Sequence, residues 1–347
     1  MGASRHTRGE AQGILERHTG VVIPVYFATV PPKTEARELL EDTLHAYVDQ
    51  AGDPASVCLS VDGEEHGKEI AEALAASTGA SIVVAERNRG KFQAAMLGAR
   101  TLLKNETMRY IAVVDQDGDH FANELLNFIR MAKHIGAETG IERIIVLGRR
   151  ISKHHPMGFL RGELEELADR VLQDMLHYRA ATAGRPLDLR YATLLEEFPD
   201  FHSGYKVYSR ATAHDIFDTD PDAAGLPEDA GLRHGCEVIP LVEGLEMGAV
   251  LGVVNRSTFN EQPVTVFGGL DRIRLIADKI LWPARRLEIP PAFVLQWMRN
   301  HIPRLLLTTL APEGREEVMQ ILEMVRETLT GHTEPPDGDS PGGPLFL

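Results

Sequence analysis

The segment that decides the fold reads Tyr110-Ile-Ala-Val-Val-Asp-Gln-Asp-Gly-Asp-His120, an apolar, β-branched run followed directly by a group of acids. Such a run predicts a buried strand, and in an open parallel sheet ligands bind at the carboxyl ends of the strands. Asp115 and Asp117 lie two residues apart just past this strand, and Gly118 lets the backbone turn. Carboxylates in this arrangement suit a hard divalent cation, Mg²⁺ or Mn²⁺, together with substrate phosphates.

Similar apolar runs recur along the chain and alternate with amphipathic stretches of helical period. Strands are expected at residues 21–25, 57–61, 81–85, 110–114 and 144–147. Between them, apolar side chains fall at helical steps, as at Leu40, Leu44 and Val48, which predicts helices that cover the sheet. The alternation predicts an α/β fold with a Rossmann-like, mostly parallel sheet flanked by helices.

The expected organisation has four parts. They are a polar N-terminal tail at 1–18, an α/β catalytic domain at 19–260, a helical C-terminal region at 261–330 and a disordered tail at 331–347. Within the α/β domain, residues 161–177 are predicted to form a long charged helix. The stretch 215–229 is rich in Asp, Ala, Gly and Pro, which predicts a mobile loop rather than a packed element. Later helices are expected at 270–281, 291–307 and 315–328.

The composition favours a soluble, folded protein. Of 347 residues, 43% are apolar, which is enough for a substantial core. The 36 basic and 51 acidic side chains give a formal charge of −15, which disfavours binding to nucleic acid. Cys58 and Cys236 form neither a zinc array nor a disulfide framework. No apolar stretch of about 18 residues occurs, so we expect neither export nor a transmembrane segment, and the default location is the cytoplasm.

Basic side chains are interleaved with apolar ones between residues 271 and 304, around Trp282 and Trp297. This pattern favours a surface that covers the core or forms a subunit interface, as in a homo-oligomer. The alternative is a peripheral contact with a membrane surface.

The acid cluster has other interpretations. A solvated acidic turn is one, but the position directly after a buried strand favours a functional role. A calcium loop of EF-hand type fails, because His120 and Leu126 stand where that loop needs Gly and Glu. A phosphatase of the haloacid dehalogenase type would use Asp115 as its nucleophile, although three predicted strands precede this one. A nucleotidyltransferase would show a Gly-rich basic loop at residues 27–32, where this chain has none.

Four motifs in chain order resemble those of the family 2 type of glycosyltransferases with the GT-A fold, from Gly20 to Arg256. They are Val-Val-Ile-Pro-Val-Tyr at 21–26, Ser-Val-Asp-Gly at 60–63, Asn-Arg-Gly-Lys at 88–91 and the pair Asp115 and Asp117. The Asn that usually follows the first motif is Phe27 here.

Two later segments extend the resemblance. Residues 202–210 are similar to the family's glycine-containing stretch beside the sugar and acceptor, and Pro-Glu-Asp at 227–229 looks like its ED motif. The late QxxRW motif of the family is incomplete, since Arg299 is followed by Asn300.

The resemblance implies a metal-dependent glycosyltransferase that takes a nucleoside diphosphate sugar as donor, uses Mn²⁺ or Mg²⁺, and transfers the sugar to an unknown acceptor hydroxyl. It assigns the metal to Asp115 and Asp117 and the nucleobase to Asp62. The residues expected to bind the donor and its metal are Pro24, Tyr26, Asp62, Asn88, Gly90, Lys91, Asp115, Gln116 and Asp117. Ser203 and Gly204 are expected beside the acceptor.

A general base completes the expected site. The resemblance implies that Asp229, the second acid of the ED motif, removes the acceptor proton, and that transfer inverts the sugar's configuration. Glu228 beside it and Glu237, on the following apolar run, are the alternatives. If no such base serves, a retaining mechanism becomes the better account.

The histidines near these motifs have two interpretations. His202, His214 or His234 can complete a metal shell, but we favour ordinary surface or core histidines. His154 and His155 carry no recognisable ligand spacing. A non-catalytic nucleotide-sugar-binding protein stays open as well, because the first and last motifs depart from the family pattern.

Overall fold

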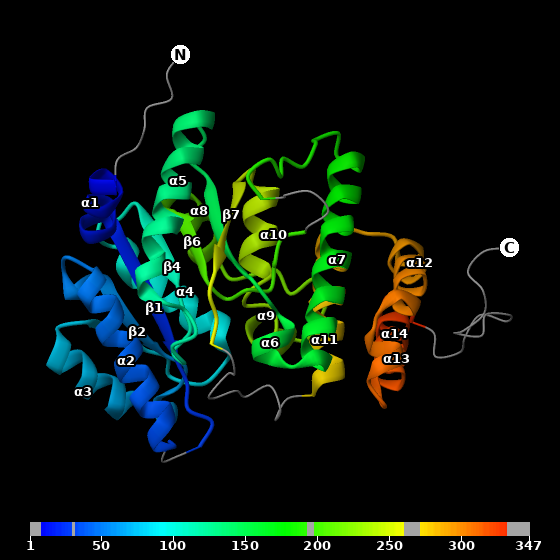
Figure 1. Ribbon diagram of the computed structural model, residues 1–347, viewed down its shortest axis with the longest axis horizontal. Helices are drawn as coiled ribbons and strands as arrows, with labels where there is room; N and C mark the ends of the chain where they lie inside the picture. The colour runs from blue at the N-terminus through cyan, green and yellow to red at the C-terminus, as the bar shows by residue number, and fades with distance from the viewer. Residues whose placement is uncertain (1–7, 30–31, 193–197, 260–270, 332–347) are drawn as a thin grey trace, which may run out of the picture. The chain divides into compact units, whose positions relative to one another are not determined.

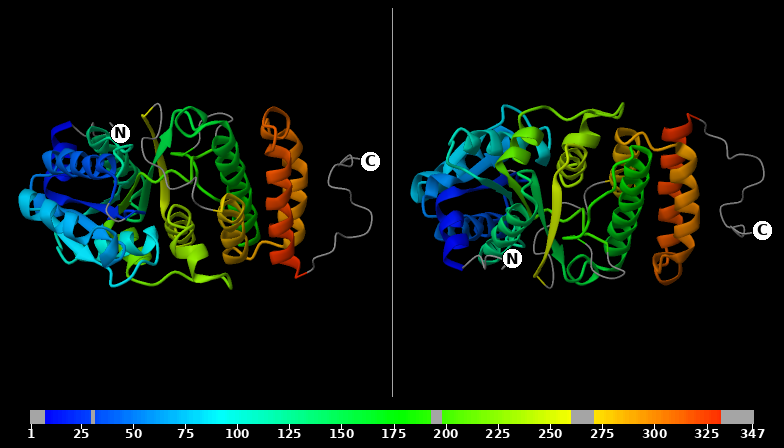
Figure 2. Two further views of the ribbon diagram at one scale, coloured as in Figure 1. Left: turned by 90° about the horizontal axis from the view of Figure 1, so that it is seen from below. Right: turned by 90° about the horizontal axis from the view of Figure 1, so that it is seen from above.

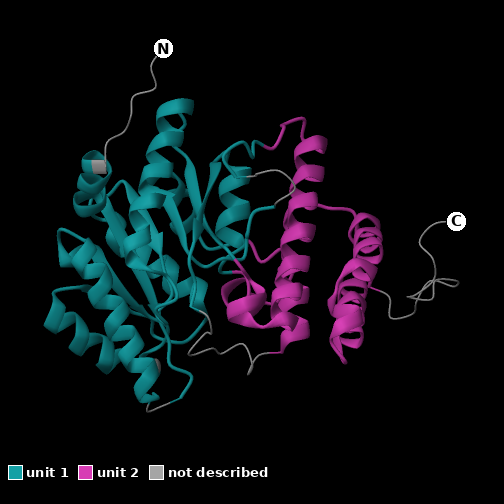
Figure 3. Ribbon diagram, in the orientation of Figure 1, with its two compact units in different colours: residues 1–151, 188–221, 236–264 teal, residues 152–187, 222–235, 265–347 magenta. Residues whose placement is uncertain are grey.

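The computed structural model describes residues 8–29, 32–192, 198–259 and 271–331, and the chain divides into two compact units (Figure 1, Figure 3). Unit 1 comprises residues 1–151, 188–221 and 236–264, and unit 2 comprises 152–187, 222–235 and 265–347. Each unit combines segments that are far apart in the sequence. The division therefore runs across the stretch 19–260, which we predicted to be one domain.

Unit 1 is built on a seven-stranded sheet with the order β3-β2-β1-β4-β6-β5-β7. The strands are β1 (Thr19–Val25), β2 (Val57–Val61), β3 (Ser81–Val84), β4 (Tyr110–Val113), β5 (Ile144–Arg150), β6 (Lys206–Ser209) and β7 (Val250–Arg256). β6 pairs antiparallel with β4 and β5, and all the other neighbours are parallel. The five predicted strands are confirmed. β6 and β7 are additions. Lys206 and Ser209 leave only two apolar residues in β6, and Gly252 and Asn255 interrupt the apolar run that would have indicated β7.

Helices lie on both faces of this sheet (Figure 2). They are α1 (Arg8–His18), α2 (Thr34–Gln50), α3 (Lys68–Thr78), α4 (Lys91–Leu103), α5 (Leu125–Thr139), α8 (Arg210–Phe217) and α10 (Ile239–Glu246). One apolar core joins α1, α2, α3 and α5 to the sheet, with Leu44 and Phe128 at its centre. α4 lies so close to the strands that a Cβ on Gly98 would come within 2.4 Å of Val22 Cγ1. The predicted α/β class, a mostly parallel sheet flanked by helices, is confirmed.

The N-terminal segment differs from the prediction. Residues 8–18, expected to be part of a polar tail, form α1, and its Ala11 and Leu15 are 0% and 2% exposed. These two residues are four apart and form an apolar stripe of only one helical turn. Such a short stripe does not stand out in a charged segment.

The strand register brings three strand ends to one edge of the sheet. Val22 pairs with Val113 across β1 and β4, and Val25 pairs with Val61 across β1 and β2. Because these strands are parallel, the segments that follow them all emerge at the same edge, where ligands bind in open α/β sheets. Three of the four motifs singled out above lie in these segments.

Unit 2 is helical. Its helices are α6 (His154–Met157), α7 (Phe159–Thr182), α9 (Glu228–Leu232), α11 (Arg272–Arg286), α12 (Pro291–His301), α13 (Leu307–Leu310) and α14 (Gly314–Thr330). α7 packs against α11, and α11 packs against α14. The predicted long charged helix is α7, and the helical C-terminal region is confirmed. The helix expected at 291–307 instead ends at His301, because Pro303 follows and a proline in a helix interior removes a hydrogen bond.

Two further predictions concern loops. The stretch 215–229 starts inside α8 and ends inside α9, and Leu226 between them is 9% exposed, so it is not purely a loop. Its apolar residues are too few to indicate helices. Of the predicted disordered tail, residues 332–347 lie outside the described residues. Among the described helices, none has the length and apolar character needed to cross a membrane.

Candidate active site

The acidic loop that follows β4 is held by its own side chains. The backbone N–H of Asp115 donates to Nδ1 of His120 over 2.9 Å, and the N–H of Asp119 donates to Oδ1 of Asp117 over 3.2 Å. Gly118 has φ of +79°, in the left-handed region that glycine adopts without strain. The sequence therefore sets a tight turn that presents Asp115 and Asp117 at the edge of the sheet.

Gln116 ties this loop to the end of β1. Its Oε1 accepts from the backbone N–H of Tyr26 over 2.9 Å, and its Nε2 donates to the carbonyl oxygen of Tyr26 over 2.8 Å. The side-chain amide thus continues the hydrogen-bond ladder between β1 and β4. Gln116, predicted to contact the donor, positions the loop through the backbone of Tyr26. Pro24, also predicted there, is buried within β1 opposite Ser60.

Behind the loop, Asp119 forms a buried ion pair with Arg256 at the end of β7. The two side chains are 4% and 2% exposed, and Arg256 Nη1 lies 3.1 Å from Asp119 Oδ2. The other carboxylate oxygen of Asp119 accepts from the backbone N–H of Phe259 over 2.9 Å. Asp119 is therefore engaged on both oxygens and serves as support for the loop.

Lys91, at the start of α4, pairs with one of the predicted metal ligands. Its Nζ lies 2.7 Å from Oδ1 of Asp115 and 2.8 Å from Oε1 of Glu237. Burial alone would lower the pKa of Lys91, but the charges of Asp115 and Glu237 outweigh it and raise that pKa well above the usual range. Lys91 thus stays charged and joins two acids that are far apart in the sequence.

Asp115 and Asp117, two acids separated by one residue and called the DxD motif below, differ in their proton affinity. Burial works to raise the pKa of Asp115, but Lys91 and then His120 lower it more strongly, so the pKa falls below its usual range. Burial and the neighbouring charge of Asp115 raise the pKa of Asp117 to about 7. The negative charge that Asp115 and Asp117 would share is thus only partly compensated by protein cations.

Asp62, predicted to read the nucleobase, binds the protein backbone. One of its oxygens accepts from the N–H of Arg89 over 3.0 Å and the other from the N–H of Gly90 over 2.9 Å. Gly63 has φ of +98°, and a Cβ there would come within 2.7 Å of the nitrogen of Asn88. The carboxylate and the glycine together fix the loop 88–90 that leads into α4 and Lys91.

The segment before β6 reaches Asp115 at Gly204, one of the two residues predicted beside the acceptor. A Cβ on Gly204 would lie 3.1 Å from Asp115 Oδ2 and 3.1 Å from His120 Cε1. Ser203 is fully buried, and its carbonyl oxygen accepts a hydrogen bond from Nζ of Lys206. Gly204 therefore borders Asp115, and the Ser203 hydroxyl accepts from Arg256 Nε over 3.4 Å.

A small cavity opens between α4, β6 and the start of α10. Its polar lining comes from Lys91, Lys206, Cys236 and Glu237, with Gly204 beside them. Its volume of about 10 Å³ is close to the minimum for a single water molecule. Burial lowers the pKa of Lys206 to about 8. The cavity is lined by charged side chains and is too small for a sugar nucleotide.

The predicted ED motif belongs to unit 2. Asp229 accepts from Arg274 Nη2 over 2.8 Å, and its side chain is 38% exposed. Glu228 lies beside it at the start of α9. Arg274 also lies 3.6 Å from Asp278, which in turn is 2.7 Å from His234 Nδ1. The motif is therefore part of a local network of acids and bases within unit 2.

Of the histidines near the motifs, the structure brings one to the site, and it is His120, which we did not predict. Its ring stacks on Tyr205 with a centroid distance of 4.9 Å, and burial lowers its pKa well below the usual range. Because Nδ1 accepts from Asp115, the neutral ring carries its proton on Nε2. His202 is buried, and His214 pairs with Asp218 over 2.6 Å. The signal in the sequence for His120 at this site is its position only five residues after Asp115.

No family model matches the sequence, and no curated protein sequence matches it. Among solved structures, the chain is similar to glucosyl-3-phosphoglycerate synthase from Mycobacterium tuberculosis in complex with Mn²⁺, UDP and glucosyl-3-phosphoglycerate. The identity is 18% and the TM-score 0.46, over 83% of this chain and 85% of that chain. It is also similar to S. aureus TarS 1–349, with 13% identity and a TM-score of 0.40 over 91% and 92% of the two chains.

A third similar structure is a cytidylyltransferase from Leptospira borgpetersenii, with 9% identity and a TM-score of 0.41 over 70% of this chain and 77% of that one. At these identities and TM-scores the likenesses are to the fold, and the function of this chain must follow from its own side chains.

Proposed function

We propose that this protein is a metal-dependent glycosyltransferase that moves a sugar from a nucleoside diphosphate sugar to an acceptor hydroxyl. The observation that carries the proposal is the pair Asp115 and Asp117 at the carboxyl end of a buried parallel strand, with Lys91 Nζ 2.7 Å from Asp115. Two acids and a lysine at this edge provide both a cation site and a positive charge for phosphate oxygens.

The acids fit a divalent cation such as Mn²⁺ or Mg²⁺. Both metals prefer oxygen ligands, and both acids supply them. Burial, and then the charge of Asp115, raise the pKa of Asp117, so a bound cation would favour the ionised form of Asp117. Gly204 leaves space beside the acids, because a Cβ at this position would lie only 3.1 Å from Asp115 Oδ2. When bound, the cation stabilises the negative charge on the departing diphosphate.

The side chains at this edge have separate roles in binding the metal and the diphosphate. Asp115 and Asp117 would hold the metal, and Lys91, which pairs with Asp115 in this structure, would supply positive charge to the diphosphate. Glu237 then retains the ammonium of Lys91 near the site, 2.8 Å away in this structure. Asp62 acts through the loop 88–90, whose backbone it holds. These roles require only charge pairing and hydrogen bonding.

For the acceptor proton we keep Asp229 as the candidate base, which makes inversion the expected outcome. Its exposure of 38% leaves it accessible, and Arg274 orients one of its oxygens. Glu237 is less suited, because its side chain is only 17% exposed and is paired with Lys91. Asp229→Asn is expected to lower kcat and leave the affinity for donor nucleotide unchanged. A loss of kcat in Glu237→Gln, with no loss in Asp229→Asn, would reverse the assignment.

Thermal stabilisation by nucleotides tests the binding part of the proposal. Unfolding is followed with UDP, GDP, CDP, ADP and dTDP, each with and without Mn²⁺, since a ligand that binds only the folded state raises Tm. We expect a Mn²⁺-dependent rise for at least one nucleotide. Asp117→Asn should abolish it, and Asp42→Asn, an exposed acid on α2, should retain it. An unchanged rise in Asp117→Asn would overturn the site.

Turnover tests the catalytic part. The nucleotide sugar that binds best is incubated with Mn²⁺ and a panel of acceptor hydroxyls, and release of nucleoside diphosphate is measured. Release that depends on an acceptor supports transfer. Binding without release across the panel would favour a nucleotide-sugar-binding protein, and a phosphorylated Asp115 trapped with a phosphate ester would favour a phosphoryl-transfer enzyme.

A further inference from the structure

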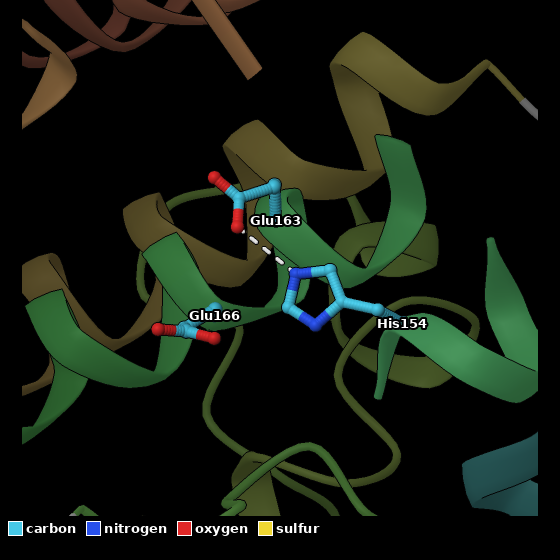
Figure 4. Close-up of side chains that lie close together, drawn as sticks. All are labelled: His154, Glu163 and Glu166. Atoms are coloured by element: carbon cyan, nitrogen blue, oxygen red, sulfur yellow. Dashed lines mark hydrogen bonds and ion pairs between the residues drawn. The ribbon is translucent and has the colours of Figure 1, made fainter. Parts of the chain in front are cut away.

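Unit 2 carries a cluster of metal-ligating side chains that the proposed function does not use. His154 on α6 and Glu163 and Glu166 on α7 each offer one ligand atom, and these atoms lie within 4.8 Å of one another. Figure 4 shows the imidazole facing the carboxylate of Glu163, with Glu166 on the same side of the ring. Glu163 and Glu166 are three residues apart, so they share one face of α7. All three residues belong to unit 2, and none is part of the DxD site.

The position of His154 is set by the backbone around it. Gly158, between α6 and α7, has φ of +78°, which allows the chain to reverse there. Gly162 faces the histidine: a Cβ at this position would lie 2.8 Å from His154 Cδ2 and 3.0 Å from its Cα. The absence of a side chain at 162 thus lets α6 pack directly on α7 and places the imidazole over Glu163.

The carboxylates are also oriented. Oε1 of Glu163 lies 2.9 Å from Nε2 of His154, and its Oε2 accepts from the backbone N–H of Leu307 over 3.3 Å. Glu163 is therefore held by one oxygen while the other faces the imidazole, an outer hydrogen bond of the kind that orients metal ligands. Arg170 donates to Oε1 of Glu166. A carboxylate has two oxygens, so this bond leaves a second one for a metal.

The ligand types indicate the kind of ion. One imidazole nitrogen and two carboxylate oxygens form a mixed set that suits zinc or a similar transition ion better than magnesium. Three protein ligands leave a fourth tetrahedral position for water. Metal–ligand bonds of about 2.0–2.1 Å put tetrahedral ligand atoms about 3.3 Å apart. In this structure the three ligand atoms lie within 4.8 Å of one another, with His154 Nε2 and Glu163 Oε1 at 2.9 Å, so a bound ion would adjust these separations.

We propose that His154, Glu163 and Glu166 bind a divalent transition-metal ion, with Zn²⁺ the best fit, at a site separate from the DxD site. The ion links α6 to α7 and replaces the direct contact between His154 and Glu163. This proposal is independent of the glycosyltransferase activity, since its three ligands come from a different unit.

Metal binding is measured on the full-length Asp117→Asn protein, so that the DxD site does not contribute. Zn²⁺ is titrated by calorimetry at pH 7.5, and Co²⁺ is titrated by visible absorption, whose intensity reports a four-coordinate site. We expect one ion per chain. His154→Ala and Glu166→Gln should each weaken binding more than about tenfold, and His155→Ala, an exposed neighbouring histidine, should leave it unchanged.

Several outcomes would overturn the proposal. They are no binding of Zn²⁺ by the Asp117→Asn protein, binding that survives both His154→Ala and Glu166→Gln, and equal losses in His154→Ala and His155→Ala. Circular dichroism checks that each variant is folded. If His154→Ala is unfolded, Zn²⁺ binding by Glu166→Gln tests the proposal. This variant should fold, because glutamine keeps the size of the side chain and the contact with Arg170 is on the surface.

Discussion

Replacement of Gly204 by alanine tests whether the geometry around Asp115 is as tight as the structure indicates. The added Cβ would lie 3.1 Å from Asp115 Oδ2, 3.1 Å from His120 Cε1 and 3.3 Å from Asp115 Oδ1. The two closest separations are roughly 0.4 Å shorter than an optimal contact of about 3.5 Å. Asp115 or His120 must therefore move.

Neither neighbour moves freely. His120 is stacked on Tyr205 and accepts from the backbone of Asp115, and the Asp115 carboxylate is paired with Lys91. We expect Gly204→Ala to lower the free energy of unfolding by about 1–3 kcal/mol, as overpacking does. Displacement of a metal ligand by a few tenths of an ångström should also weaken Mn²⁺ binding by roughly tenfold.

The assay is urea unfolding without metal, followed by calorimetric titration of Mn²⁺ into the folded protein. Gly9→Ala is the matched control, because a Cβ at Gly9 in α1 meets nothing within 4 Å. That change should stabilise the protein by at most about 1 kcal/mol and leave Mn²⁺ affinity unchanged. Wild-type stability and Mn²⁺ affinity in Gly204→Ala would refute the proposed contact between Gly204 and Asp115.

Further predictions follow from buried charges. Burial lowers the pKa of Lys206 from 10.5 to about 8, so between these values the unfolded chain binds more protons and stability should rise with pH, by at most about 3 kcal/mol. Urea unfolding from pH 7 to 10 should show this rise in the wild type and not in Lys206→Met. Arg150 binds Asp200 in the buried interior through two short contacts, and Arg150→Met should cost about 3 kcal/mol or more, a cost that Asp200→Asn in the same chain should reduce. Asp62→Ala removes the acceptor for two backbone N–H groups and should weaken nucleotide binding measured by calorimetry. Unchanged binding would remove Asp62 from the site.

Local sequence patterns were sufficient for the strands and for the place of the DxD motif. An apolar run of four or five residues that ends in acids specifies both a buried strand and the polar group at its end, because burial and charge are properties of neighbouring residues. For the same reason Gly118 could be predicted as the residue at which the chain turns. The loop 88–90 was recognised, but its attachment to Asp62 was not visible.

Partners that are far apart in the chain could not be predicted. Lys91 and Glu237 are 146 residues apart and meet within 2.8 Å, and nothing local to either residue indicates the other. Gln116 was taken for a donor contact, yet the fold uses its amide to bind the backbone of Tyr26. The sequence does not indicate α1, β6 and β7, because their apolar faces are short or interrupted.

The sequence alone determined that this chain forms an α/β sheet with two acids at the end of its fourth strand, since strand formation and local charge depend on adjacent residues. Only the tertiary structure decided which cation faces those acids, which glycine leaves space beside them, and which segments leave the sheet to form unit 2. Ion pairs, close approaches and unit boundaries arise when distant segments pack together, and the spacing of residues along the chain does not encode that packing in a readable pattern.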